Sequence, residues 1–158
     1  MDRADDGRAQ QPLEDVLLLV SVAIEGSEGI AGTRAAARSF LTDLRVVHGL
    51  PVSERAVGLV QLVVSELVTN ACKYAPGPCL LTMEAERGTV EVSVWDSDPT
   101  LPVARDHDPG RVGQHGLEIV MAVCQDFGVH REAVGKRVTA TIELADAPGG
   151  APLGGQGG

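Results

Sequence analysis

Two short segments with a strict alternation of apolar and polar side chains constrain the fold most strongly. Residues 79–86 alternate in this way, and residues 89–96 repeat the pattern with three valines. Only Arg87 and Gly88 separate the two segments, which predicts a tight hairpin. Because successive side chains of a strand point to opposite faces, the pattern predicts a sheet with one buried face and one wetter face.

Helical and strand patterns surround this hairpin. Residues 13–24 favour a strand, although so apolar a run also fits a helix. The predicted elements around the hairpin are a strand over residues 13–24, helices over 30–47, 53–74 and about 116–127, and a last strand over 137–144. Ser53 is a good N-cap for the second helix. The predicted apolar face of this helix comprises Val57, Val60, Val64, Leu67, Val68 and Ala71. This order predicts an α/β (α+β) two-layer sandwich, with a mixed, mainly antiparallel sheet covered on one face by helices.

The chain of 158 residues has the length of one domain. Residues 1–12 are polar and residues 146–158 are rich in glycine and proline, so both are predicted to be disordered tails. The folded domain is then residues 13–145. Within it, residues 97–115 lose all periodicity, which is typical of a functional lid or a disordered insert.

Composition excludes several classes of function. Acidic residues outnumber basic ones 22 to 13, which argues against a generic nucleic-acid binder but leaves room for a nucleotide site. Cys72, Cys79 and Cys124 are too few and too scattered for a disulfide framework, and no CxxC pair indicates zinc. No apolar run approaches the roughly 20 residues of a membrane span, and no basic signal region is present. We therefore expect a soluble, cytoplasmic protein with cysteines as small buried hydrophobes.

Glu66 and Asn70 stand out on the second predicted helix. They are four residues apart, so they lie on one face. Asparagine is unfavourable inside a helix, and the pair therefore suggests a carboxylate and an amide facing a cleft. The alternative is a solvated helix face.

The segment Val64–Tyr74, with the order Glu-x-x-x-Asn-Ala, resembles the N box of the GHKL ATPase superfamily. That group contains gyrase, Hsp90, histidine kinases and the anti-sigma-factor serine kinases. The resemblance implies a Bergerat ATP-binding fold over about residues 24–144, with ATP and Mg²⁺ as cofactors. It implies that Asn70 completes the Mg²⁺ shell with the ATP phosphates and that Glu66 is the general base. Lys73 would reach a phosphate, or else be a solvated charge at the helix end.

A second motif ends the strand over residues 89–96. By its position, Asp96 resembles the family's aspartate that accepts a hydrogen bond from the adenine amine, although it also fits a turn aspartate. The family's following Asp-x-Gly-x-Gly pattern is absent, because Ser97, Asp98 and Pro99 stand there instead. That departure resembles the shorter motif of actinobacterial anti-sigma-type regulators.

A third motif, residues 111–120, resembles the family's G box, where a glycine-rich loop opens a helix. Backbone N–H groups at such a start can hold phosphate. Here the first glycine is displaced one residue earlier. The resemblance implies that nucleotide contacts come from Arg111, Gly113, His115, Gly116 and Leu117. His115 could equally cap the helix.

The closing strand begins Gly135-Lys136-Arg137 where the family often has a threonine that helps to bind adenine. Lys136 or Arg137 takes that place. Thr139 or Thr141 could substitute only if the register of the strand allows it.

Among GHKL proteins, the anti-sigma-factor serine kinases consist of a single small ATP-binding unit, and this sequence resembles them in that respect. The resemblance implies a kinase that phosphorylates an anti-anti-sigma (STAS-type) protein and sequesters a sigma factor, with no direct binding of nucleic acid or membrane. Family members often form homodimers. Two alternatives remain: an ATP-binding interaction module without phosphoryl transfer, and a scaffold that has lost ATP.

Overall fold

The computed structural model describes residues 16–74, 77–98 and 116–145. In chain order its elements are β1 (Leu18–Ile24), α2 (Gly26–Val46), α3 (Glu54–Tyr74), β2 (Cys79–Ala85), β3 (Thr89–Asp96), α4 (Gly116–Val123), β4 (Asp126–Arg131) and β5 (Lys136–Glu143). The predicted tails and residues 99–115 of the predicted lid lie outside the described residues.

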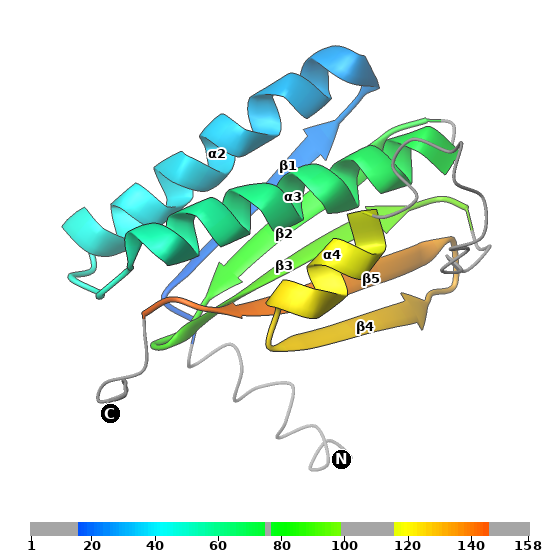
Figure 1. The fold of residues 1–158 in the computed structure, drawn as a ribbon. Helices are drawn as coiled ribbons and strands as arrows, with labels where there is room; N and C mark the ends of the chain where they lie inside the picture. The colour runs from blue at the N-terminus through cyan, green and yellow to red at the C-terminus, as the bar shows by residue number, and fades with distance from the viewer. Residues whose placement is uncertain (1–15, 75–76, 99–115, 146–158) are drawn as a thin grey trace, which may run out of the picture.

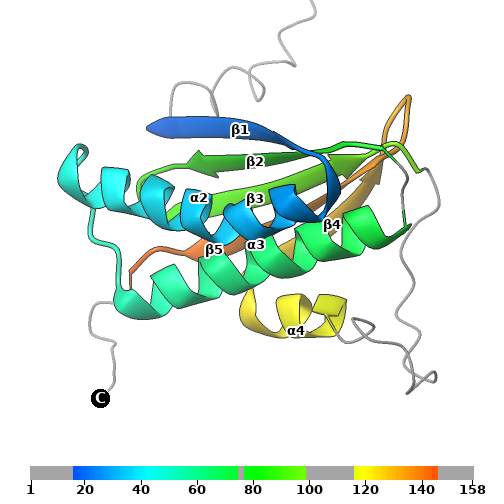
Figure 2. The same ribbon diagram turned by 90° about the horizontal axis from the view of Figure 1, so that it is seen from above.

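The five strands form one sheet in the order β1-β2-β3-β5-β4, and every neighbouring pair is antiparallel. The three helices cover one face of this sheet, with α3 between α2 and α4 (Figures 1 and 2). The predicted two-layer α/β sandwich is therefore confirmed, and the hairpin across Arg87 and Gly88 joins β2 to β3 as expected. The sheet is wholly antiparallel among the described strands rather than mixed.

The central helix α3 forms where the sequence predicts it. The Ser53 hydroxyl accepts a hydrogen bond from the Ala56 N–H at 3.0 Å, which satisfies one of the free donors at the helix start. The predicted apolar face is buried throughout, and it comprises Val57, Val60, Val64, Leu67, Val68 and Ala71. This face packs on the sheet and supplies the middle of the core. Segment Glu54–Cys72 has the length and apolar character of a membrane span, but in this fold it is the core helix.

Several predicted boundaries were wrong. Helix α2 begins at Gly26, before the predicted start at residue 30, because Gly29 lets the first turn pack closely on Ile24. Val47, the last residue of the predicted helix, is the C-cap of α2 and is 70% exposed. Strand β1 begins at Leu18 within the described residues.

The largest error concerns the segment after the lid. The third helix ends at Val123, and Phe127 belongs to strand β4, which the sequence analysis missed. Phe127 pairs with Ala140 of β5 and packs against the core from this edge strand. Its spacing from Leu117 and Val120 fits a helical stripe, so periodicity alone could not separate the two structures.

The turn between β4 and β5 packs against the end of β3. The Trp95 indole N–H donates to the carbonyl oxygen of Val134 at 2.8 Å. Gly135 follows with a φ of 78°, in the left-handed region that favours glycine. A Cβ added at Gly135 would overlap the carbonyl oxygen of Asp96. Glycine is thus needed here for two independent reasons.

We predict that Gly135→Ala lowers the free energy of unfolding by about 2 kcal/mol or more, because the added Cβ meets rigid backbone and the φ is unfavourable. Urea denaturation followed by circular dichroism measures the change. Gly58→Ala in α3 is the matched control. An added Cβ there meets no atom within 4 Å, so it should stabilise the protein by about 0.5–1 kcal/mol. Equal stability of Gly135→Ala and wild type would contradict the close approach.

Candidate functional site

Four elements meet at one end of the molecule. Strand β3 ends there at Asp96, opposite Lys136 at the start of β5. Strand β2 begins there at Cys79, directly after α3 has ended. The two cysteines at this junction, Cys72 of α3 and Cys79, have their sulfur atoms 3.4 Å apart. The C-terminal end of α3 and the end of β3 therefore lie close together, although Tyr74 and Asp96 are 22 positions apart in the sequence.

Asp96 and Lys136 form a buried ion pair. The Lys136 Nζ lies 3.0 Å from Asp96 Oδ1 and 2.9 Å from the carbonyl oxygen of Asp98. The N–H of Asp98 donates to the same Oδ1 at 2.9 Å. Asp96 is 1% exposed and Lys136 is 4% exposed. Because a buried charge is costly without a partner, this pairing explains how both groups remain inside.

The register of β5 decides which residue takes the place of the family's threonine. Lys136 is the residue opposite Asp96. Thr139 pairs with Ser93, and Thr141 pairs with Glu91. Both threonines alternate with the buried Val138 and Ala140, so they lie on the sheet face away from the helices. Neither Thr139 nor Thr141 can therefore take the place of the family's threonine beside Asp96. Lys136 takes that place and forms an ion pair with Asp96, which no feature of the sequence indicated.

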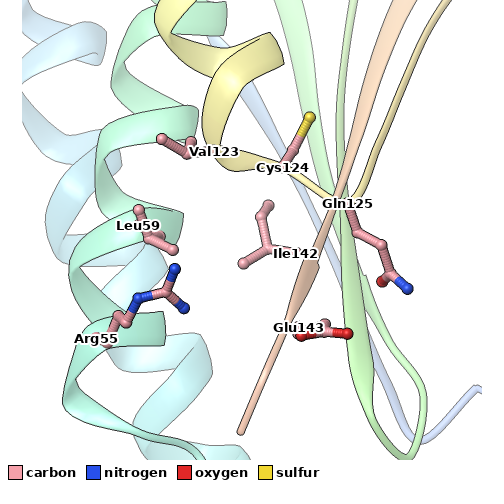
Figure 3. A pocket seen from close by; sticks show the side chains of 7 residues that line it. All are labelled: Arg55, Leu59, Val123, Cys124, Gln125, Ile142 and Glu143. Atoms are coloured by element: carbon pink, nitrogen blue, oxygen red, sulfur yellow. The ribbon is translucent and has the colours of Figure 1, made fainter. Parts of the chain in front are cut away.

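The α3 flank that faces α4 carries Glu66 and Asn70. Leu59, Glu66 and Asn70 follow at intervals of seven and four residues, which places them along one flank of the helix. Leu59 lines a cavity with Val123 and Cys124 at the end of α4 (Figure 3). Glu66 and Asn70 lie further toward the C-terminal end of the same flank. Both are half-buried, and neither forms a hydrogen bond or ion pair with another residue that the structure describes.

The start of α4 lies beside this flank. Helix α4 runs antiparallel to α3, so its first turn is directed toward the C-terminal half of α3 (Figure 1). Gly116 and Leu117 form that first turn, and Leu117 is 8% exposed. Lys73 lies in the last turn of α3. Arg111, Gly113 and His115 lie outside the described residues, so their predicted contacts remain predictions.

A cavity of about 180 Å³ lies elsewhere, between the N-terminal half of α3, the end of α4 and the last part of β5 (Figure 3). Its lining is Arg55, Leu59, Val123, Cys124, Gln125, Ile142 and Glu143. None of the predicted site residues lines it. Ile142 and Glu143 end the strand that Lys136 begins, so the cavity and the ion pair are at opposite ends of β5.

The cysteine pair at the α3–β2 junction is reduced, and all three cysteines are free. Cys79 is buried, whereas Cys72 and Cys124 are half-buried. Burial, the contact with Cys72 and the negative charge of Asp96 together raise the pKa of the Cys79 thiol to about 12. Cys79 therefore remains a neutral thiol at physiological pH and acts as a buried hydrophobe, as the sequence predicted.

The family model for the histidine kinase-like ATPase domain matches residues 31–142 of this chain. The chain belongs to this family. The match begins inside α2 and ends within β5, so it includes the N-box helix, the ion pair and α4. Membership supports ATP binding and a regulatory role of the GHKL type, and it confirms the resemblance drawn from the sequence.

A solved histidine kinase domain from the blue-light activated histidine kinase of Erythrobacter litoralis EL346 is also similar to the ATPase domain. It is 20% identical, with a TM-score of 0.40, and the match covers 71% of this chain and 61% of that chain. No curated protein matches.

The two ends of the predicted site of this ATPase domain fit a nucleotide in different ways. Glu66 and Asn70 offer a half-buried carboxylate and amide whose oxygen atoms are hard ligands, which suits a metal-bound phosphate. Within the described residues, no group of three or more His, Cys, Asp or Glu side chains forms a metal site, and a magnesium ion shared with phosphates needs only one or two protein ligands. At the other end, the Asp96 acceptor is accompanied by the Lys136 donor. Both ends therefore hold polar groups that suit ATP.

We predict that Lys136→Met lowers the free energy of unfolding by about 3–5 kcal/mol, because it leaves the buried Asp96 carboxylate without its partner. Urea denaturation at pH 7 measures the loss. Arg137→Met is the control. Arg137 pairs with Glu132 at 3.1 Å and is 44% exposed, so its loss should cost less than about 1 kcal/mol. Equal effects of the two substitutions would show that burial does not strengthen the Asp96 pair.

Proposed function

We propose that this ATPase domain is a cytoplasmic anti-sigma-factor-type serine kinase. It would use ATP and Mg²⁺ to phosphorylate a serine of a STAS-type anti-anti-sigma protein, and it would sequester a sigma factor. Family membership supports the ATP-binding part. The further steps rest on the residues of α3.

The arrangement of Glu66 and Asn70 carries the proposal. They are one helical turn apart on the flank that faces α4, and both are half-buried. Neither side chain forms a hydrogen bond or ion pair with another residue that the structure describes. A carboxylate with no ionic partner can accept the proton of a serine hydroxyl, while an adjacent amide oxygen binds the metal. Asn70 would thus hold the triphosphate through Mg²⁺, and Glu66 would act on the attacking hydroxyl.

The partner would be a protein rather than a nucleic acid. The chain has a net charge of −9, which disfavours contact with a phosphate backbone. Homodimer formation, as in related kinases, would be part of the same proposal.

We predict that Glu66→Ala reduces phosphate transfer by about 10²–10⁴-fold and leaves nucleotide binding intact, because only the general base is lost. The measurement is transfer from [γ-³²P]ATP to a panel of purified STAS-type anti-anti-sigma proteins. Glu91→Ala is the matched control, since Glu91 is exposed on the sheet face away from the helices. Undiminished transfer by Glu66→Ala would remove Glu66 from the mechanism.

A second candidate function is an ATP-binding interaction module without phosphoryl transfer. The altered sequence beside Asp96 favours it, because Ser97, Asp98 and Pro99 stand in place of the family's glycines and Lys136 lies where the family often has a threonine. ATP would then stabilise a surface that binds a protein partner. A stoichiometric complex with a partner and no transfer of label in the assay above would support this function over the kinase.

We predict that Asn70→Ala weakens binding of Mg-ATP at least about tenfold but leaves binding of ATP in EDTA unchanged, because it removes a metal ligand only. Isothermal titration calorimetry with and without Mg²⁺ measures both affinities. Gln61→Ala is the control and should change neither affinity, because half-buried Gln61 lies on the side of α3 that faces α2, where its amide donates to the carbonyl oxygen of Arg34 at 3.1 Å. Tight Mg-ATP binding by Asn70→Ala would contradict the metal assignment for both candidate functions.

A further inference from the structure

The Asp96–Lys136 pair lies at the end of the predicted site that would contact the purine base, which we call the base end. The pair changes which hydrogen-bonding groups this end offers to a ligand. Lys136 Nζ uses two hydrogen bonds, one to Asp96 Oδ1 and one to the carbonyl oxygen of Asp98. An ammonium group has three N–H donors, so one donor has no partner among the residues that the structure describes. The carboxylate and the ammonium together offer an acceptor beside a donor, and their charges sum to zero.

Purine bases differ at the edge that such a pair would meet. A 6-amino purine has an amine donor at position 6, whereas a 6-oxo purine has an acceptor oxygen there. A lone carboxylate only accepts hydrogen bonds, so it binds the amine and repels the oxygen. A carboxylate paired with an ammonium group can serve either base, because the amine can donate to the carboxylate and the oxygen can accept from the ammonium.

We propose that Lys136 is a specificity-determining residue that lets this site take 6-oxo as well as 6-amino purine nucleotides. The inference rests on the ATP-binding part of the proposed function and is independent of phosphoryl transfer.

The surrounding structure holds Lys136 in this role. The strand register puts Lys136 directly opposite Asp96. Gly135 packs its Cα against the backbone of Asp96 and Ser97, which fixes the start of β5 beside the end of β3. Lys136 is 4% exposed, so its side chain has little contact with water. The ammonium group is therefore a fixed part of the base end rather than a mobile surface charge.

The test compares ADP with IDP, which differ in the purine at position 6 and the adjoining ring nitrogen. Calorimetry with Mg²⁺ measures the ratio of the affinities for ADP and IDP in four proteins: wild type, Lys136→Thr, Lys136→Gln and Arg137→Thr. We expect wild type to bind the two nucleotides within roughly threefold of each other, and Lys136→Thr to prefer ADP by about tenfold or more. Lys136→Gln keeps an N–H donor and should stay near the wild-type ratio. Arg137→Thr, on the opposite face, should match wild type.

Each other outcome contradicts the proposal in a distinguishable way. A wild-type preference for ADP of about tenfold or more overturns the role of Lys136, and this result needs no folded variant. An unchanged ratio in folded Lys136→Thr does the same. Binding of ADP by Lys136→Thr alone would mean that Lys136 excludes the base. Binding of neither nucleotide by any folded form would instead overturn ATP binding itself, whereas a lack of phosphate transfer leaves the inference standing.

Discussion

The packing of α3 against the sheet is the constraint on which the rest of the structure depends. Its buried face is made largely of valine and leucine, and α2 and α4 lie on either side of it over the same sheet (Figure 2). A helix held on three sides cannot rotate without exposing apolar side chains to water. The core therefore fixes the flank that carries Glu66 and Asn70, and with it the direction in which these two groups face. A catalytic or metal-binding pair gains precision from such a rigid support.

A second constraint acts at the end of β3, where a carboxylate is buried. Asp96 can stay inside because Lys136, the N–H of Asp98 and the close approach of Gly135 surround it. The same contacts tie the β4–β5 turn to β3, together with the bond from Trp95 to Val134. Under our proposal, the residues that stabilise this end of the sheet would also contact the purine base. A substitution at Lys136 is expected to alter both, which is why the binding ratio of two nucleotides separates its roles better than affinity alone.

The sequence predicted an element correctly where its residue pattern fits only one kind of secondary structure. The alternation in β2 and β3, the N-cap at Ser53 and the apolar face of α3 each predicted the observed element. The prediction failed at β4, because this strand has only six residues and the spacing of Phe127 from Leu117 and Val120 also fits a helix. At the site, Glu66 and Asn70 could be placed on one flank from their spacing alone. The Asp96–Lys136 pair could not be foreseen, because it depends on the register between two strands 40 residues apart in the chain.

Most departures from the family pattern lie beside Asp96, where the glycines and the threonine are missing, and one glycine of the G box is displaced, whereas the N box is intact. A nucleoside triphosphate carries most of its charge on the phosphates and the bound metal, so the groups on α3 would provide most of the binding energy. The base end would then mainly select which nucleotide is held. Loss of the family's glycines and threonine beside Asp96 is therefore compatible with ATP binding, provided that another group meets the base. Lys136 is the residue that the register of β5 puts in that place.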